Sequence, residues 1–156
     1  SDRRQRQMCI RDRSYTTADM ESPIADLHFD LHNIPLEDNL YDVIFCNHVL
    51  EHVQDDHQCM KELLRVMKPG GWGIFQVPID YNNKVTYEDS SITDPKEREI
   101  HFWQKDHVRL YGLDYPKKLE KAGFKVDVFD PKTALGEINY EKLRLNSSEL
   151  IFIARK

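Results

Sequence analysis

The pattern of apolar and polar positions predicts strands and helices in turn along most of the chain. Short apolar runs bounded by turn-forming residues are typical of β-strands. Six such runs lie at 15–20, 27–30, 41–46, 73–77, 124–130 and 149–154. The run at 41–46 (YDVIFC) is almost wholly apolar, which favours a parallel strand covered on both faces.

The clearest helix falls between the third and fourth of these runs. An i, i+3, i+4, i+7 stripe is formed by Met60, Leu63, Leu64 and Met67. Asp55 is placed as the N-cap with Gln58 in the capping-box position, and Pro-Gly-Gly at 69–71 predicts the helix end. A second helix is expected where Pro116 suits a first turn and Gly123 suits a C-cap. Helices that alternate with strands indicate a layered α/β sheet.

Residues 80–106 carry no sustained apolar period. They are polar with scattered aromatic side chains, and a stretch of this length inside a domain is usually a lid or a disordered excursion. Because it follows the strand at 73–77, we expect it at the carboxyl edge of the sheet, where open α/β sheets bind ligands. We therefore predict that residues 80–106 form a lid.

Composition and charge limit the partners. The 156 residues suit one domain, and no apolar run is long enough to span a membrane. The three cysteines, Cys9, Cys46 and Cys59, form no CxxC pair, which favours a reduced, cytoplasmic setting. The net charge is −5, and an acidic body does not suit a nucleic-acid surface.

The segment at 1–13 differs from the rest of the chain. It holds five arginines and two aspartates (SDRRQRQMCIRDR), a net charge of +3. This arm is either an RNA- or lipid-binding tail or a segment foreign to the protein, since the string resembles translated sequencing-adapter sequence. We favour the foreign origin and place the domain at 14–156.

The heptapeptide CNHVLEH at 46–52 admits two interpretations. His48, Glu51 and His52 match the HxxEH pattern of one class of zinc peptidase. Such a site needs one helix that carries both imidazoles, and a third ligand elsewhere. The helix signals begin only at Asp55, so the two histidines straddle a turn after the strand. We therefore rank the zinc-peptidase hypothesis last and expect no metal in the site.

Two longer segments resemble class I S-adenosylmethionine-dependent methyltransferases of the small-molecule, type 11-like kind. Residues 27–53 (LHFDLHNIPLEDNLYDVIFCNHVLEHV) and 62–78 (ELLRVMKPGGWGIFQVP) are similar to that family's third strand, fourth strand, following helix and fifth strand, in that order. DHVRLYG and LEKAGFKVDVFD resemble its later helix and sixth strand. The resemblance implies a Rossmann-like methyltransferase sheet with helices on both faces.

The resemblance also implies a set of cofactor-binding positions, which are Asp19, Met20, Asp30, Leu31, Asn47 and His48. A carboxylate at a strand end can accept hydrogen bonds from both hydroxyls of a ribose, and Asp19 fills that role by resemblance, with Met20 beside the adenosine. Asp30 and the Leu31 amide face the adenine edge. Asn47 and His48 border the methionine portion and the methyl group.

The acceptor side rests on the segment at 80–106 and the residues after it. The lid aromatics expected to shape an acceptor pocket are Tyr81, Tyr87, His101, Phe102 and Trp103. An oxygen or nitrogen acceptor can need a general base. We predict His107 as that catalytic base in preference to His101, because DHVRLY resembles the family pattern.

The sequence departs from the family in two places. A glycine-rich loop after a first strand should precede Asp19, but the first glycine of the chain is Gly70. We therefore expect a C-terminal portion of a methyltransferase domain that binds the cofactor weakly by itself. Asp19 and Asp30 lie close together in sequence, with Pro23 between them, so the helix between those strands is shortened or missing.

Two functions from different classes follow. The first is transfer of a methyl group from S-adenosylmethionine to a small or medium-sized acceptor. The second is a non-catalytic Rossmann-like module with a binding or regulatory role. A glycine-rich turn upstream in the reading frame would favour the enzyme, and a degraded loop there would favour the module.

Overall fold

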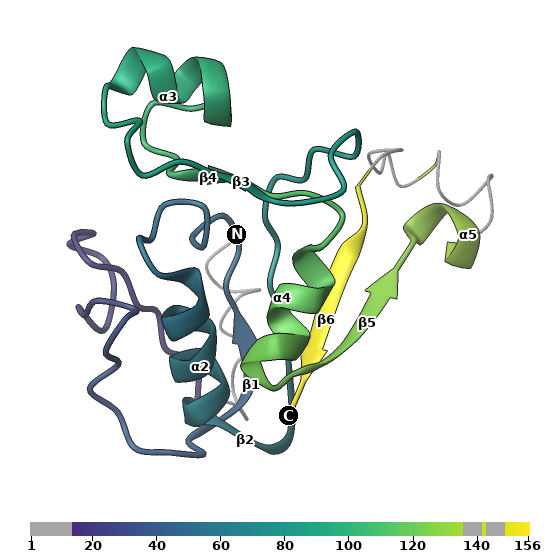
Figure 1. Cartoon of the computed structure of the whole chain (residues 1–156). Helices are drawn as coiled ribbons and strands as arrows, with labels where there is room; N and C mark the ends of the chain where they lie inside the picture. The colour runs from purple at the N-terminus through teal and green to yellow at the C-terminus, as the bar shows by residue number, and fades with distance from the viewer. Residues whose placement is uncertain (1–13, 136–141, 143–148) are drawn as a thin grey trace.

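The computed structural model of the chain describes residues 14–135, 142 and 149–156. Four strands form one mixed sheet in the order β1-β2-β6-β5. They are β1 (Tyr41–Phe45), β2 (Met67–Ile74), β5 (Lys125–Phe129) and β6 (Ile151–Arg155). β1 and β2 run parallel, and β6 lies antiparallel between β2 and β5 (Figure 1). The predicted α/β sheet is therefore confirmed.

Two helices pack against each other and cover one face of this sheet. They are α2 (Asp56–Val66) and α4 (Tyr115–Ala122), and both lie in front of the strands in Figure 1. The core that they close with the strands includes Met60, Phe75, Leu119 and Phe152. Val43, Phe45 and Trp72 lie on the other face and are exposed. In the described residues, therefore, these helices cover one face, whereas helices on both faces were predicted.

α2 begins where the sequence predicts. It ends at Val66, one residue before Met67, the last position of the predicted apolar stripe. Asp55 is the N-cap, and its side chain accepts a hydrogen bond from the Gln58 N–H at 2.9 Å. The Gln58 side chain donates to the His32 carbonyl at 3.2 Å, so the expected capping box does not close. Met67 is extended and opens β2 instead of ending the helix, because Pro69 disfavours helical geometry just before it.

The two strands predicted at 15–20 and 27–30 are not formed. The segments meet in a single parallel bridge between Ala18 and Leu27. The Asp19 N–H donates to the Leu27 carbonyl at 3.1 Å, and the Leu27 N–H donates to the Thr17 carbonyl at 3.0 Å. A short run of this kind needs a further paired neighbour to extend, and no described residue provides one.

The later elements match their sequence signals. Pro116 lies in the first turn of α4, and Gly123 ends that helix at a φ of +116°, which favours glycine. β5 and β6 cover most of the runs predicted at 124–130 and 149–154. A short helix, α5 (Pro131–Leu135), follows β5.

Residues 80–106, which keep the name lid segment from the sequence prediction, lie above the carboxyl ends of β1 and β2 (Figure 1). The lid segment contains strand β3 (Tyr87–Glu88), which pairs with β4 (Arg109–Leu110), and a helix, α3 (Pro95–Phe102). α3 was not predicted from the sequence, because only Phe102 of that helix is buried and no apolar stripe results. The usable signal was Asp94 before Pro95, since the Asp94 side chain caps the helix.

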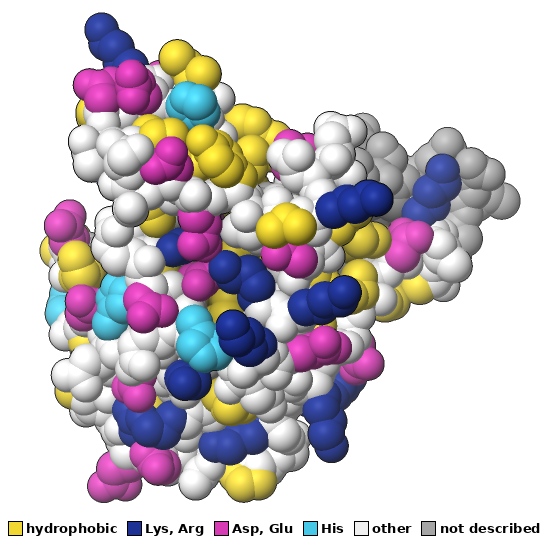
Figure 2. Space-filling model, in the orientation of Figure 1, with side chains coloured by type: hydrophobic (Ala, Val, Ile, Leu, Met, Phe, Trp, Pro, Cys, Tyr) yellow, Lys and Arg dark blue, Asp and Glu magenta, His cyan; other side chains and the backbone are white. Residues whose placement is uncertain are grey.

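The surface seen in Figure 2 carries acidic and basic side chains side by side over α2 and α4. Apolar side chains gather higher on the same face, around the lid segment, where Val85, Ile100 and Trp103 are exposed. Among the described residues, no helix is both long enough and apolar enough to cross a membrane.

Candidate functional site

The loop that follows β1 (the post-β1 loop, residues 46–55) lies at the carboxyl edge of the sheet. Its backbone is fixed to the end of β2, because the His48 N–H donates to the Gln76 carbonyl at 2.7 Å. The Asn47 side chain accepts from the Gln76 N–H at 3.3 Å. His48 has a φ of +56°, a left-handed conformation that is uncommon outside glycine. The loop thus makes a sharp turn directly after the strand.

The HxxEH residues lie in this turn and not on a helix. The His52 N–H donates to the Val49 carbonyl at 3.0 Å, and α2 begins only at Asp56. This confirms the expected turn between His48 and His52. The helix that the zinc-peptidase hypothesis requires is absent from the described residues, so the hypothesis loses its structural basis.

Arg109 holds the post-β1 loop from the other side. Its side chain is 3% exposed and reaches the loop from β4. The guanidinium donates to three carbonyls, those of Leu50 at 2.7 Å, Gln54 at 2.8 Å and Val53. One buried cation therefore replaces the regular backbone pairing that a loop lacks. The DHVRLYG run that contains Arg109 was recognised from the sequence, but its contact with this loop was not, because the two segments are distant in sequence.

A buried charge network extends this anchor. Asp56 accepts from the Tyr111 hydroxyl at 2.9 Å and from Lys118 Nζ at 3.1 Å. Glu88 accepts from Arg109 Nε at 2.8 Å and from Lys118 Nζ at 2.9 Å. The network joins β3 and β4 to the start of α2 and to α4, so it fixes the lid segment to the two helices that cover the sheet.

Asp19 and Asp30, the two predicted strand-end carboxylates, both lie in turns. Asp19 Oδ1 accepts from the Glu21 N–H at 2.8 Å and from the Ser22 N–H at 2.7 Å, and these bonds lower the pKa of Asp19. Asp30 Oδ1 accepts from the His32 N–H at 2.9 Å and lies 2.6 Å from His32 Nδ1, and both contacts lower its pKa. Both carboxylates are therefore ionised at neutral pH.

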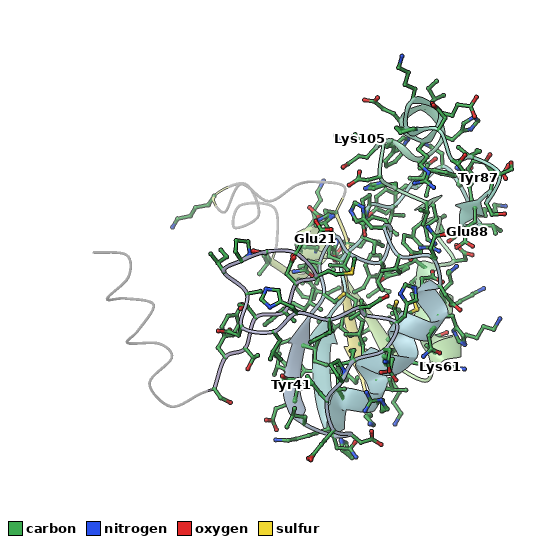
Figure 3. The ribbon with its side chains drawn as sticks, turned by 90° about the vertical axis from the view of Figure 1, so that its left-hand side faces the viewer. Glu21, Tyr41, Lys61, Tyr87, Glu88 and Lys105 are labelled. Atoms are coloured by element: carbon green, nitrogen blue, oxygen red, sulfur yellow. The ribbon has the colours of Figure 1, made fainter. Side chains whose placement is uncertain are left out.

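The segment that carries these carboxylates reaches the carboxyl edge. Figure 3 shows Glu21, two positions after Asp19, at the opposite end of the sheet from Tyr41, where β1 begins. His32 connects Asp30 to α2, since His32 Nε2 accepts from the Asp55 N–H at 3.1 Å. His32 was missed because nothing marks it as more than a neighbour of Asp30.

Residues 5–75 match the methyltransferase domain family, a stretch that includes Asp19, Asp30, Asn47 and His48. The chain is 32% identical over 108 residues to an uncharacterized 37.1 kDa protein of transposon Tn4556 from Streptomyces fradiae, covering 68% of this chain and 30% of that protein. It is 29% identical over 109 residues to a protein from Mycolicibacterium smegmatis named as a probable S-adenosylmethionine-dependent methyltransferase, covering 67% of this chain and 37% of that protein. The chain thus spans about a third of the length of these relatives.

The fold agrees. A solved S-adenosylmethionine-dependent methyltransferase from Archaeoglobus fulgidus superposes with a TM-score of 0.56 at 14% identity, covering 99% of this chain and 82% of that one. The match of residues 5–75, the relatives and the fold together support the class I S-adenosylmethionine-dependent methyltransferase family. The recognition made from the strand and helix order is therefore confirmed.

Four further positions of the chain were predicted to line the cofactor site. Met20 is exposed, and Leu31 packs against the core with its side chain. Asn47 and the 58%-exposed side chain of His48 lie at the end of β1. The structure thus brings Asn47 and His48 together at the edge, and places Met20 beside Asp19 in the turn.

His107, the predicted general base, is 2% exposed. Its Nδ1 lies 2.9 Å from the Phe102 carbonyl, and its ring meets the His52 ring edge-on, with the centroids 4.7 Å apart. The Val108 N–H donates to the Glu51 carbonyl at 2.9 Å, so His107 is fixed against the post-β1 loop. His107 therefore packs against the end of the HxxEH turn and does not lie on an exposed surface of the lid segment.

The predicted lid aromatics lie in three different places. Tyr81 lines a cavity of about 200 Å³ beside α4 and β6, together with Ile79, Gly112, Leu113, Pro116, Val128, Leu150 and Phe152. Tyr87 packs with His101 and Phe102 inside the lid, at ring-centroid distances of 6.0 and 5.4 Å. Trp103 is exposed. Of the five aromatics, Tyr81 alone lines this cavity.

Proposed function

We propose that the protein transfers a methyl group from S-adenosylmethionine to a small or medium-sized acceptor. The observation that carries this proposal is the family match over 5–75, which spans the two ionised carboxylates Asp19 and Asp30. Membership of a family that uses this methyl donor supports the cofactor. The position of the lid segment at the carboxyl edge supports a ligand site there.

The hydrogen-bond acceptors of the chain fit the nucleoside part of the cofactor. Asp19 and Asp30 each place Oδ1 in a turn, which holds the carboxylate in one orientation and keeps it charged. A ribose diol and an adenine amine are hydrogen-bond donors, and a charged carboxylate is the strongest acceptor a side chain offers them. We assign Asp19 to the ribose, Asp30 with the Leu31 amide to the adenine, and Met20 to apolar contact with the adenosine.

Asn47 and His48 are assigned to the methionine portion of the cofactor. Bound S-adenosylmethionine supplies an electrophilic methyl group on a sulfonium, so the protein has chiefly to orient the acceptor and to exclude water. Alignment of this kind lowers a barrier by several kcal/mol, on the order of 7–11 in favourable cases. The post-β1 loop, held by Arg109, provides a rigid floor for that alignment.

His107 is our candidate for the base that takes a proton from the acceptor. Its Nδ1 faces a carbonyl, which can only accept, so Nδ1 carries the hydrogen and Nε2 carries the lone pair in the neutral ring. Because the ring is buried, the acceptor atom would have to enter the space beside Glu51 and His52. The cavity of about 200 Å³ beside Tyr81 is smaller than the usual small-molecule site, and its lining does not include Glu51, His52 or His107, so we do not assign the acceptor to it.

The test uses the product of the natural reading frame that contains this sequence. The protein is incubated with S-adenosylmethionine and panels of small hydroxyl and amine compounds, and S-adenosylhomocysteine is measured. We expect turnover with at least one panel, which His107→Gln lowers with little change in cofactor affinity. His57→Gln, at a partly exposed position of α2 that has no assigned role, serves as the matched control and keeps full turnover.

The second candidate is a non-catalytic module with the same fold. The reading frame upstream of Asp19 distinguishes the two candidates, because a glycine-rich turn there favours the enzyme and a degraded loop favours the module. A protein that binds S-adenosylmethionine but releases no S-adenosylhomocysteine with any panel would support the module. A protein that binds no S-adenosylmethionine at all would contradict the proposed enzyme.

A further inference from the structure

Glu51, His52 and His107 bring their side chains together at the carboxyl edge. One ligand-type atom from each, a carboxylate oxygen and two imidazole nitrogens, lies within 4.8 Å of the other two. Among the residues that the structure describes, this is the one such group of three. Two of its members come from the post-β1 loop and the third precedes β4, so the group joins segments that are distant in sequence.

The Glu51 carboxylate is buried without adequate partners. The residue is 1% exposed, and Oε2 has no hydrogen-bond partner among the described residues. Oε1 lies 3.4 Å from His48 Nδ1 and 4.0 Å from His52 Nε2. A buried carboxylate oxygen without a donor is costly, so the site favours a positive charge beside it.

Both imidazoles present a lone pair beside this carboxylate. His107 Nδ1 faces the Phe102 carbonyl at 2.9 Å, and His52 Nδ1 faces the Asp106 carbonyl and carboxylate at 3.3 Å each. These oxygens only accept, so Nδ1 carries the hydrogen in both rings and Nε2 remains a ligand atom. An oxygen behind each imidazole is the arrangement that orients histidine in metal sites.

We propose that Glu51, His52 and His107 bind a divalent transition-metal ion of the zinc class. Two imidazole nitrogens and one carboxylate favour such an ion over magnesium or calcium, which prefer oxygen ligands. Three protein ligands leave a coordination position open, as in catalytic sites. With metal–ligand bonds of about 2.0–2.2 Å, the three atoms must draw closer by roughly 1 Å on binding. His48, which is exposed and lies in the turn, places its Nδ1 3.4 Å from Glu51 Oε1.

The ligand set differs from the HxxEH peptidase pattern. That pattern pairs His48 with His52 on one helix, whereas here His107 from a distant segment takes the place of His48. The sequence spacing alone could not show this, because the contact between the post-β1 loop and His107 depends on the fold. The sequence led us to expect no metal here, because His48 and His52 do not lie on one helix. The proposed site differs from that expectation because its third ligand is His107.

One consequence rests on the proposed methyl transfer. A metal ion would occupy the Nε2 lone pair of His107, which would then act as a ligand and not as the base. The ion would take over that task, because a coordinated hydroxyl loses its proton at a lower pH than a free one. Metal binding itself does not depend on methyl transfer, so its test is carried out without S-adenosylmethionine.

The test uses the whole 156-residue chain, stripped with a chelator and then titrated with Zn²⁺ in a calorimeter. We expect one ion per chain and a rise in thermal midpoint when the ion is added. Glu51→Gln and His107→Ala should each weaken binding more than about 100-fold, since even outer-shell changes cost 10–100-fold. His101→Ala, a histidine of α3 outside the group, is the matched control and should keep wild-type affinity.

Cobalt substitution separates this site from adventitious binding by thiols. A Co²⁺ complex with nitrogen and oxygen ligands shows ligand-field bands without the intense sulfur charge-transfer band of a thiolate site. Circular dichroism of each variant without metal checks that it still folds, and Glu51→Gln preserves the shape of the side chain. Absence of stoichiometric binding, a thiolate band, or unchanged affinity in folded Glu51→Gln and His107→Ala would each overturn the proposal.

Discussion

The guanidinium of Arg109 donates a hydrogen bond of 2.7 Å to the Leu50 carbonyl, across 59 positions of sequence. This contact joins the start of β4 to the loop that follows β1, and Leu50 itself is fully buried. The lid segment lies between the two partners in sequence. Arg109 therefore determines both the shape of the post-β1 loop and the way the lid segment is attached to the sheet.

Replacement of Arg109 should be strongly destabilising. Arg109→Met would remove the hydrogen bonds that Arg109 donates to three loop carbonyls and to Glu88, although Tyr111 still lies beside the Leu50 carbonyl and Lys118 still donates to Glu88. The loss of one member of a buried charged set typically costs about 3–5 kcal/mol. Urea denaturation of the chain measures the change. Arg155→Met is the matched control, since Arg155 and Asp127 form an exposed pair worth at most about 1 kcal/mol. Equal losses in the two variants would contradict the anchoring role of Arg109.

Tyr111→Phe tests the second anchor of the same loop. The Tyr111 hydroxyl donates to Asp56 at 2.9 Å and lies 3.1 Å from the Leu50 carbonyl, and the residue is fully buried. Removal of the hydroxyl alone should lower the free energy of unfolding by about 1–3 kcal/mol, because buried acceptors lose their donor. The 68%-exposed Tyr15 provides the control, and Tyr15→Phe should leave the denaturation midpoint unchanged.

The strand and helix order could be predicted from the sequence where local signals were complete. The apolar run at 41–46 and the stripe of α2 each carry their own period, and both indicated elements close to the observed bounds. The segments at 15–20 and 27–30 carry strand-like composition but lack a paired neighbour in the described residues. Strand formation depends on that neighbour, which composition does not report.

The site was predictable only in part, for a similar reason. Asn47 and His48 could be placed at the strand end because they follow an apolar run directly. The contact of His107 with His52 and the three hydrogen bonds of Arg109 to the post-β1 loop join segments that are distant in sequence. A single sequence contains no local period that would indicate such contacts.

Glu88 should make the stability of the chain depend on acidity. Burial works against its charge, but hydrogen bonds from Lys118 and Arg109 outweigh burial and hold the pKa of Glu88 below its ordinary value of 4.5. A carboxylate with a lowered pKa adds stability above about pH 4.5 and loses it as the pH falls through the lower, folded-state value. Glu88→Gln should therefore flatten the acid limb of the stability curve, while Glu99→Gln in the exposed part of α3 should not. Parallel acid limbs for wild type and Glu88→Gln would count against this coupling.

The thiols of Cys46 and Cys59 should be unreactive in the folded chain. Both residues are buried, and burial is the main cause that raises the pKa of each thiol to about 12. Thiolate is the reactive form, so almost none is present at pH 8. In a Cys9→Ser background, a thiol-specific chromogenic reagent should titrate both groups only after urea is added. Rapid reaction of either thiol without denaturant would show that the core around β1 and α2 opens readily.

Asp19→Asn tests the cofactor assignment in the product of the natural reading frame. The variant keeps the shape of the turn but removes the charge that we assign to the ribose hydroxyls, and charge-assisted hydrogen bonds are about twice as strong as neutral ones. We expect the dissociation constant for S-adenosylmethionine to rise about tenfold or more, measured by calorimetry. Asp26→Asn is the matched control, because Asp26 also holds a turn of this segment, through Thr17, and has no assigned contact with the cofactor. If both variants bind the cofactor as the wild type does, Asp19 is a turn residue and the ribose is held by other groups.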